Sequence, residues 1–377
     1  MITREKKFKL KVSSEISSLV PYPPGKPIEE LERELGIKGS IKLASNENPL
    51  GPSKKALQAI GREIANLHRY PDGSCFYLKE KLSSRLGVSG DELIFGNGSN
   101  EIIELLIRTY LKAGDEAMMG DPSFAVYPLA VQAAGGRAVT VPLTKDFRHD
   151  LVKMAKAVTK KTRLVFIANP NNPTGSIVTR GEFRAFMDKM PPEVIVCVDE
   201  AYIEFVENAE FPKTLDFVKE GRAVVALRTF SKIYGLAGLR VGYGVADKEI
   251  IGYMHRVRQP FNVNSLAQAG AIAALDDDEH LQKTLKNNRE GKKYLFAELS
   301  ALGYPCVPTH ANFFLVNVGD GPAVYQSLLK KGVIVRPMAS YNMPGYIRVT
   351  IGMPEENRRF VAAFARIVKT GRQYRAR

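Results

Sequence analysis

The sequence is short of the residues that build disulfide frameworks and metal centres, with three cysteines and five histidines among 377 residues. Cys75, Cys197 and Cys306 lie far apart and form no CxxC pair. So sparse and odd a count excludes a disulfide scaffold and favours a reducing compartment. The histidines show no spacing typical of metal ligands, so we predict no structural metal.

Long apolar runs are also absent. No segment approaches the roughly 18–20 apolar residues that a membrane-spanning helix needs. The basic N-terminus is not followed by the apolar stretch of a secretory signal peptide. We therefore expect a cytoplasmic protein that makes no contact with a membrane.

Acidic residues are fewer than basic ones, 40 against 54, which gives a formal net charge of +14. Over half of this excess falls in residues 1–11 and 369–377, where the ordinary interpretation is a solvated terminus. No basic stripe is interleaved with the aromatic residues on which nucleic-acid bases stack. We therefore predict no nucleic-acid partner, although a basic surface suits small anionic substrates.

From about residue 50 the chain alternates short apolar runs with amphipathic stretches. The runs are ELIFGN, EAMMGD, RAVTVPL, RLVFIAN, VIVCVDE, AVVALRTF and RVGYGVA. This alternation predicts an α/β fold with a mostly parallel sheet and helices on both of its faces. The tail pairs strands with helices, as in a smaller α+β domain. We predict a large domain over 46–275, a small domain over 276–377, and an N-terminal segment, 1–45, that packs with the small domain.

Ligands of parallel sheets bind outside the carboxyl ends of the strands, so the residues that follow each run are informative. After ELIF comes GNGSNE, in which Ser99 or Asn100 is a natural helix cap and the glycines let backbone N–H groups face an anion. The alternative is a capped helix without a ligand. After RLVFIA comes NPNNPTG, which offers the amide of Asn172 at a tight turn, or is simply a turn.

Charged residues follow the next two runs. Asp199 ends VIVCV, and a carboxylate there is costly unless a cation or a donor faces it. A helix cap or a core ion pair is the alternative. Lys232 follows AVVALRTF, and Arg240 lies eight residues later. A nucleophilic lysine must lose its proton, which a partly desolvated and electropositive setting favours, whereas an exposed loop lysine would have no such frame.

No single feature decides the function, but the set suits pyridoxal phosphate. The aldehyde of this cofactor needs a lysine, its ring nitrogen needs an aspartate that keeps it protonated, and its phosphate needs a helix N-terminus with hydroxyl and arginine partners. Lys232, Asp199 and the GNGSNE turn supply these groups.

The ordered motifs resemble those of the fold type I, aspartate-aminotransferase-like pyridoxal-phosphate enzymes, and most closely the histidinol-phosphate aminotransferases. The similarity runs nearly end to end, through PYPPGKPIEEL, KLASNENPLGPS, RYPDG, GNGSNEIIELL, PSFAVY, ANPNNPTG, VDEAYIEF, RTFSKIYGLAGLRVGYG, ANFFLV and YIRVTIGMPEEN. The resemblance implies a pyridoxal-phosphate-dependent aminotransferase of histidine biosynthesis that uses histidinol phosphate and 2-oxoglutarate. Aromatic aminotransferases and threonine-phosphate decarboxylases share the cofactor motifs and remain alternatives.

The resemblance also implies roles for individual residues. Lys232 would bond the cofactor and carry the proton, and Asp199 would face the ring nitrogen. The other cofactor contacts would be the ring-oxygen partners Asn172 and Tyr202, the stacking ring of Phe124, and the phosphate partners Ser99, Asn100, Thr229, Ser231 and Arg240.

For the substrate, the resemblance implies that Arg348 holds the carboxylate of glutamate or 2-oxoglutarate, and that Arg348, Arg336 and Tyr22 hold the phosphate of histidinol phosphate. Ordinary surface arginines and a packed tyrosine are the alternatives. The resemblance further implies an obligate homodimer, in which Tyr70 reaches the cofactor phosphate of the neighbouring subunit.

Overall fold

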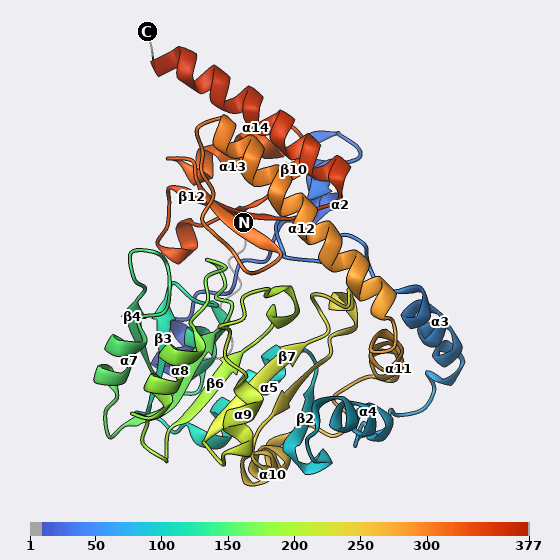
Figure 1. The fold of residues 1–377 in the computed structure, drawn as a ribbon, viewed down its shortest axis with the longest axis vertical. Coiled ribbons are helices and arrows are strands. Elements are labelled where there is room, and N and C mark those ends of the chain that lie inside the picture. Colours follow the sequence, from blue (N-terminus) through green and yellow to red (C-terminus); the bar gives the residue numbers. More distant parts are fainter. Residues whose placement is uncertain (1–9, 376–377) are drawn as a thin grey trace, which may run out of the picture.

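The computed structural model describes residues 10–375, so most of the basic N-terminal stretch and the last two residues lie outside the described part. A seven-stranded sheet forms the lower part of the molecule (Figure 1), and its strand order is β2-β8-β7-β6-β5-β3-β4. The strands are β2 (Leu93–Gly96), β3 (Glu116–Asp121), β4 (Arg137–Pro142), β5 (Thr162–Ala168), β6 (Ile195–Asp199), β7 (Val224–Thr229) and β8 (Gly242–Val245). Only β8 runs antiparallel to its neighbours, so the predicted mostly parallel sheet is confirmed.

Helices cover both faces of this sheet. Consecutive residues of a strand point to opposite faces, so one strand contributes side chains to the core on each side. Leu164 and Phe166 of β5 pack in one cluster, while Val165 and Ile167 pack in another. The first face carries α5 (Ser99–Tyr110), α6 (Val126–Ala133) and α10 (Lys248–Val257), and the second carries α7 (Leu151–Ala157), α8 (Arg180–Met187) and α9 (Thr214–Lys219). The predicted α/β class is therefore confirmed.

The start of α5 differs from the expectation. The N-cap is Gly98, with φ +77° and ψ 167°, and no side chain caps the helix. Ser99 and Asn100 are instead the first two helical residues. The prediction that one of them caps the helix was wrong, because a glycine in this left-handed conformation starts the helix one residue earlier and leaves its first N–H groups without a side-chain acceptor.

A smaller unit lies above the large sheet in Figure 1. Its three-stranded antiparallel sheet has the order β11-β12-β9, and a parallel pair, β1-β10, lies beside it. These strands are β1 (Ile41–Lys42), β9 (Phe313–Asn317), β10 (Val333–Ile334), β11 (Arg336–Pro337) and β12 (Tyr346–Thr350). Two helices pack on them, α13 (Gly321–Leu329) and α14 (Pro354–Arg375). The core of this unit combines Leu43 with Phe314, Val349, Phe360 and Phe364.

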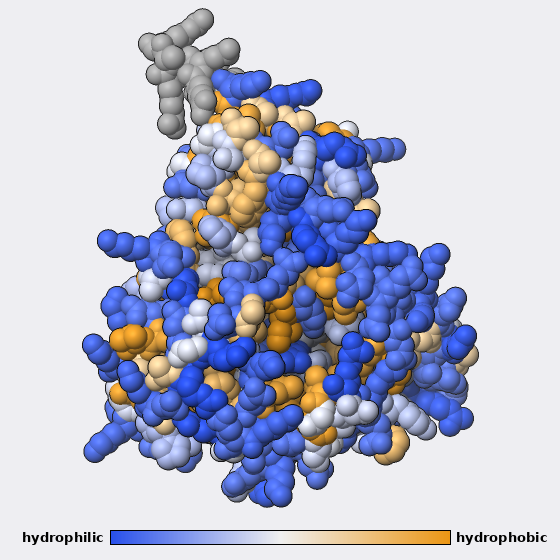
Figure 2. All heavy atoms as spheres, viewed as in Figure 1, coloured by the Kyte–Doolittle hydropathy of each residue, from blue (hydrophilic) through white to orange (hydrophobic). Residues whose placement is uncertain are grey.

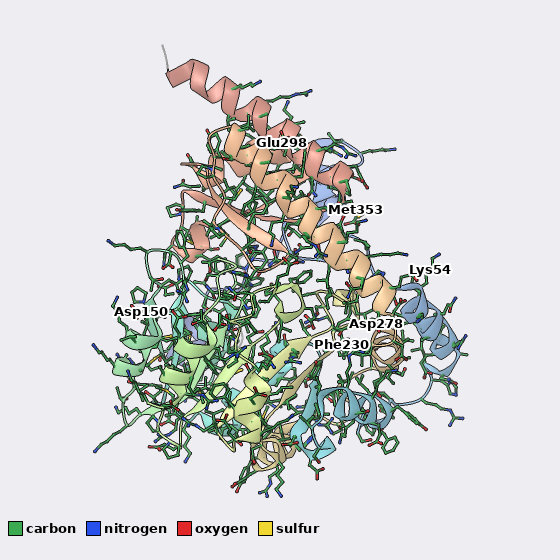
Figure 3. All side chains as sticks on the ribbon, viewed as in Figure 1. Lys54, Asp150, Phe230, Asp278, Glu298 and Met353 are labelled. Atoms are coloured by element: carbon green, nitrogen blue, oxygen red, sulfur yellow. The ribbon has the colours of Figure 1, made fainter. Side chains whose placement is uncertain are left out.

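One long helix, α12 (Asp278–Ala301), runs between the two parts. Asp278 lies near Lys54 beside the large sheet, and Glu298 lies near α14 (Figure 3). The remaining helices near its lower end are α3 (Lys54–Glu63), α4 (Phe76–Leu86) and α11 (Ser265–Ala274). The predicted domain boundaries at residues 45 and 275 stay a prediction.

The N-terminal segment contacts both parts. The short helix α1 (Ser14–Ser17) contacts α6 of the large part, and Gln132 of α6 donates to the Glu15 carbonyl at 2.9 Å. The next helix, α2 (Ile28–Leu35), packs Leu31 against Ile334 of the small unit. Hydrophilic side chains predominate on the face shown in Figure 2. Within residues 10–375, no helix has the length and apolar character that crossing a membrane requires.

Candidate active site

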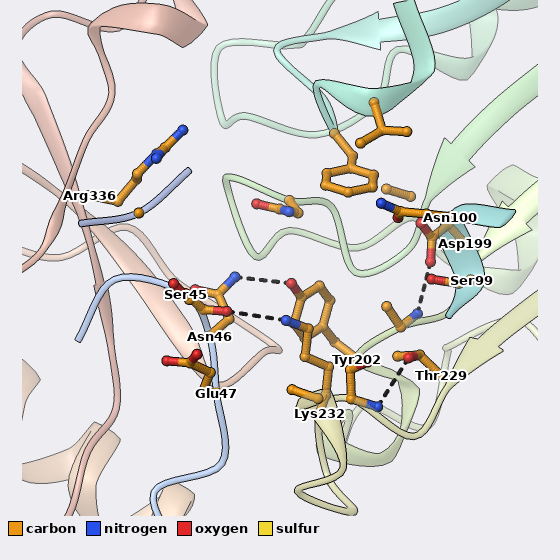
Figure 4. A pocket seen from close by; sticks show the side chains of 18 of the residues that line it. Ser45, Asn46, Glu47, Ser99, Asn100, Asp199, Tyr202, Thr229, Lys232 and Arg336 are labelled. Carbon is orange, nitrogen blue, oxygen red and sulfur yellow. Dashed lines mark hydrogen bonds between the residues drawn. The ribbon is translucent and has the colours of Figure 1, made fainter. Parts of the chain in front are cut away.

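A cavity of about 450 Å³ lies where the carboxyl ends of the large sheet face the small unit and the N-terminal segment (Figure 4). All of the predicted site residues except Tyr70 line this cavity: Tyr22, Ser99, Asn100, Phe124, Asn172, Asp199, Tyr202, Thr229, Ser231, Lys232, Arg240, Arg336 and Arg348. Residues that are up to 326 positions apart, from Tyr22 to Arg348, are thereby brought to one place.

The parallel strands explain part of this convergence. Ala168, Asp199 and Thr229 are the last residues of β5, β6 and β7, three strands that are neighbours in the sheet. Because these strands run in the same direction, their final residues meet at one edge. Most residues of these strands are buried and apolar, and the polar side chains of Asp199 and Thr229 come at the cavity ends of β6 and β7.

The carboxylate of Asp199 is 6% exposed and accepts two hydrogen bonds. The Tyr127 hydroxyl donates to its Oδ2 at 2.7 Å, and the Ala201 N–H donates to its Oδ1 at 3.1 Å. Burial raises the pKa of Asp199 to about 6, and these two donors oppose that rise. The carboxylate therefore remains mostly ionised near neutral pH and can face a cationic group.

Lys232 lies opposite, with its Nζ donating to the Ser45 carbonyl at 3.2 Å and lying 5.6 Å from the Tyr202 ring centroid. Burial, and next the charge of Arg348, lowers the pKa of Lys232 to about 8. The loop after it depends on Gly235, whose φ is +68° and whose added Cβ would lie 2.2 Å from the Gly51 carbonyl oxygen. A glycine is therefore required where this loop packs against the backbone of Gly51.

The start of α5 lies at one end of the cavity and has features that suit an anion. Its first N–H groups have no side-chain cap, and a helix N-terminus favours negative charge. Arg240 lies beside it, because a Cβ added to Gly98 would be 2.3 Å from Arg240 Nη2. The Arg240 Nη1 also donates to Ser231 Oγ at 3.4 Å. Backbone donors, hydroxyls and a guanidinium therefore converge as a phosphate group requires.

Two arginines form the other end of the cavity. Arg336 and Arg348 are paired in register on the antiparallel strands β11 and β12, so their side chains share one face. Arg348 is 6% exposed, and its Nη1 donates to Asn172 Oδ1 at 2.5 Å. Its Nε is buried without a hydrogen-bond partner among the described residues. The Arg336 guanidinium lies 5.4 Å from the Tyr22 ring centroid.

Residues 38–364 match the family model described as aminotransferase class I and II. The chain belongs to this family. It is 52% identical to a histidinol-phosphate aminotransferase of Moorella thermoacetica over 94% of this chain and 92% of that protein. It is 47% identical to a histidinol-phosphate aminotransferase of Desulfotalea psychrophila over 98% of each chain. The predicted resemblance is therefore confirmed.

Solved structures agree. The crystal structure of histidinol-phosphate aminotransferase from Sinorhizobium meliloti, in complex with pyridoxal-5'-phosphate, gives a TM-score of 0.87 at 27% identity, over 97% of this chain and 99% of that one. The corresponding enzyme of Clostridium acetobutylicum gives 0.81 at 27% identity, over 88% and 99%. An aspartate aminotransferase of Thermus thermophilus, 23% identical, shares the fold with a TM-score of 0.81, over 95% and 100%.

Within this class I and II aminotransferase, Tyr70 does not line the cavity. Its side chain is 84% exposed and stacks on Phe261 with ring centroids 4.9 Å apart. The arrangement within one chain thus leaves Tyr70 free to contact a second molecule.

Sequence reasoning missed Tyr127 and assigned no role to Asn46, although both contact predicted site residues. Tyr127, which donates to Asp199, lies in the motif PSFAVY and looks like any core aromatic, since it also stacks on Phe166 at 4.8 Å. Asn46, in KLASNENPLGPS, donates from its Nδ2 to Tyr202 Oη at 3.0 Å. No local pattern identifies either contact, because both partners are distant in sequence.

Proposed function

We propose that this aminotransferase moves an amino group between L-histidinol phosphate and 2-oxoglutarate, as a step of histidine biosynthesis. The observation that carries the proposal is the paired Arg336 and Arg348 facing Lys232 across one cavity. Curated relatives at about 50% identity over nearly the whole chain bear the name histidinol-phosphate aminotransferase, which supports the same substrate.

The cofactor is pyridoxal phosphate, and the cavity fits it. Asp199, an ionised buried carboxylate, suits the ring nitrogen, and the N-terminus of α5 with Arg240 suits the phosphate. The remaining contacts would come from Phe124 on the ring face, Asn172 and Tyr202 at the ring oxygen, and Ser99, Asn100, Thr229 and Ser231 at the phosphate. When bound, the cofactor supplies the electron sink that makes the α-proton of the substrate removable.

Lys232 is the proton carrier in this proposal. A base works best when its pKa is near the working pH, and the pKa of Lys232 is lowered to about 8. Near neutral pH a useful fraction of the amine is therefore neutral and able to accept the proton from the substrate Cα. The same Nζ, once protonated, would give that proton to the aldehyde carbon of the cofactor within the same half of the reaction, and it would carry a proton in the reverse direction in the other half.

The two substrates share one anion site. Arg348 holds the carboxylate of 2-oxoglutarate, for which its planar fork is suited. Arg336, with Arg348 and Tyr22, holds the phosphate of histidinol phosphate. The in-register placement of the two arginines supports this sharing, because two guanidinium groups on one face can bind either a carboxylate or a doubly charged phosphate.

The working enzyme is a cytoplasmic homodimer in this proposal, and Tyr70 of each subunit contacts the cofactor phosphate of the other. Besides Phe261, which stacks on Tyr70, large apolar side chains of α3, α4 and the segment that joins them are exposed: Leu57, Ile64, Leu67, Phe76 and Tyr77. We call these residues, with Tyr70, the α3–α4 apolar surface. Monomeric proteins seldom expose so many large apolar residues in one region, which supports association.

Absorbance of the cofactor-loaded protein tests the function. Adding histidinol phosphate without a keto acid should convert the near-visible band of the cofactor to the spectrum of its amino form, and 2-oxoglutarate should restore it. Phenylalanine serves as the competing substrate, and Lys232→Ala as the inactive control. A response to phenylalanine alone, or release of carbon dioxide from threonine phosphate, would overturn the substrate assignment. No cofactor band after addition of pyridoxal phosphate would overturn the whole proposal.

The substitution Arg336→Gln should distinguish binding of the histidinol-phosphate phosphate from binding of the glutamate carboxylate. The substitution should lower kcat/KM for histidinol phosphate by about 10- to 100-fold, because a charge-assisted hydrogen bond contributes about 1.5–3 kcal/mol. The half reaction with glutamate, whose carboxylate relies on Arg348, should change less. Equal losses with both substrates would contradict the division of labour between the arginines.

A further inference from the structure

Three consecutive residues shortly after β1 each contact one key group of the cavity. The carbonyl of Ala44 accepts from Arg348 Nη2 at 2.8 Å, and the carbonyl of Ser45 accepts from Lys232 Nζ at 3.2 Å. The Nδ2 of Asn46 donates to the hydroxyl of Tyr202 at 3.0 Å (Figure 4). We call residues 44–46 the strap. Its first two contacts use the backbone, so only Asn46 acts through its side chain.

The amide of Asn46 is held in one orientation by the small unit. Its backbone N–H donates to Thr350 Oγ1 at 2.9 Å, and the Thr350 hydroxyl donates back to Asn46 Oδ1 at 3.4 Å. Asn312 Nδ2 donates to the Asn46 carbonyl at 3.0 Å. With Oδ1 turned toward Thr350, the amide NH2 has to face Tyr202.

This contact determines which groups can accept a hydrogen bond from the Tyr202 hydroxyl. A phenol hydroxyl has one proton and accepts through its lone pairs, and here a lone pair is taken by the Asn46 N–H. Among the residues that the structure describes, Asn46 is the hydrogen-bond partner of Tyr202 Oη. The hydroxyl proton therefore remains available for an acceptor inside the cavity.

We propose that Asn46 is a positioning residue for amino transfer: its amide turns the Tyr202 hydroxyl into a donor aimed at the ring oxygen of the cofactor. This inference rests on the proposed function, since it needs the cofactor in the cavity. It also links substrate binding to that hydrogen bond. Thr350, which anchors Asn46, lies on β12 two residues after Arg348, so the strand that holds the substrate anion also holds the strap.

Two substitutions remove the donor without forcing the backbone. Asn46 has φ +56°, a left-handed conformation that glycine and aspartate tolerate better than alanine does. Asn46→Gly removes the side chain. Asn46→Asp keeps its shape but replaces the donor with an acceptor, which would draw the Tyr202 proton away from the cavity. Asn48→Asp is the matched control, because it adds the same charge two residues along, where Asn48 contacts Ile233 and Thr284 instead.

The first measurement needs no cofactor. In protein labelled with 13C at tyrosine Cζ, the Tyr202 resonance, assigned with Tyr202→Phe, should move in Asn46→Gly and Asn46→Asp and stay in place in Asn48→Asp. An unmoved Tyr202 resonance in both Asn46 variants would overturn the contact. Because this readout is independent of the cofactor, it can succeed or fail whether or not the proposed function holds.

The second measurement follows the absorbance of the cofactor-loaded protein as pH is varied. A donor at the ring oxygen stabilises its negative charge, so losing the aimed donor should raise the pH midpoint of the absorbance change. We expect a rise of about 0.5–1 pH unit in Asn46→Gly, as for one hydrogen bond. In a Tyr202→Phe background the same substitution should add nothing. A similar added shift in that background would show that Asn46 acts independently of Tyr202 and would overturn the proposal.

Discussion

At the scale of single residues, Lys232 differs from an ordinary lysine through its surroundings. Its amine is desolvated and lies near Arg348 and Arg240, and both effects disfavour the charged form. The sequence predicted such a setting from the buried run before Lys232 and from Arg240 after it. It could not predict the stronger influence of Arg348, which comes from a strand of the small unit.

The lowered pKa of Lys232 predicts its reactivity. In the cofactor-free protein, labelling by an amine-reactive reagent should have its midpoint near pH 8, whereas surface lysines should titrate near 10.4, because only the neutral amine reacts. Peptide mapping of the labelled protein against pH measures this, with Lys232→Arg as the control that removes the early site. A midpoint for Lys232 near that of the surface lysines would contradict the electrostatic description.

The lowered pKa of Lys232 also makes the free energy of unfolding depend on pH. Since the folded pKa of Lys232 lies below the unfolded value, the unfolded chain binds more protons between about pH 8 and 10.5. This group therefore makes the free energy of unfolding rise with pH across that window, and it penalises the cofactor-free fold at lower pH.

At the scale of elements, the turn NPNNPTG, which follows β5 of the large sheet, packs against the small unit. Gly175 has φ +75°, its carbonyl accepts from the His310 N–H at 2.8 Å, and an added Cβ would lie 2.0 Å from Thr309 Oγ1. The sequence indicated a tight turn here. The reason for a glycine at this position is a close approach to a residue 134 positions later, which no local pattern contains.

Gly175→Ala should therefore destabilise the protein by about 2–4 kcal/mol, through left-handed strain and the overlap with Thr309. Chemical denaturation measures this. Gly181→Ala is the control, because Gly181 lies in α8 with nothing within 4 Å of the added Cβ. It should be neutral or stabilise by up to about 1 kcal/mol. Equal destabilisation by both substitutions would show that the close approach of Thr309 adds nothing to the loss of stability in Gly175→Ala.

At the scale of the whole molecule, one chain forms most of the proposed site but leaves Tyr70 outside. The α3–α4 apolar surface contains two aromatic contacts, Tyr70 with Phe261 at 4.9 Å and Phe76 with Tyr77 at 5.3 Å. These rings are exposed in the single chain. Burying them between two copies would contribute the apolar area that a stable dimer needs.

Tyr77→Glu should weaken self-association at least tenfold, because a buried charge would replace an apolar ring at the interface. Sedimentation velocity over a range of concentrations measures the effect. Tyr253→Glu, at an exposed aromatic of α10, is the control and should leave association unchanged. A wild-type protein that remains monomeric at micromolar concentration would contradict the dimer.

Much of the fold was determined by the sequence, because apolar runs and turn residues act locally. All seven predicted apolar runs of the large sheet form strands, and polar residues at or after the ends of β2, β5, β6 and β7 line one cavity. The helix cap at Ser99 or Asn100 was predicted wrongly, since Gly98 occupies the cap position with a positive φ, where Arg240 leaves no room for a side chain.

The sequence by itself determined which chemical groups are present and that they follow the ends of parallel strands. The tertiary structure alone decided their pKa values and partners, because both depend on burial and on contacts between distant segments. Asn46 meets Tyr202, 156 residues later, and Thr350, 304 residues later. Tyr127 meets Asp199, 72 residues later. Such contacts leave no periodic pattern in the sequence. They form only when distant segments of the chain pack together around one cavity.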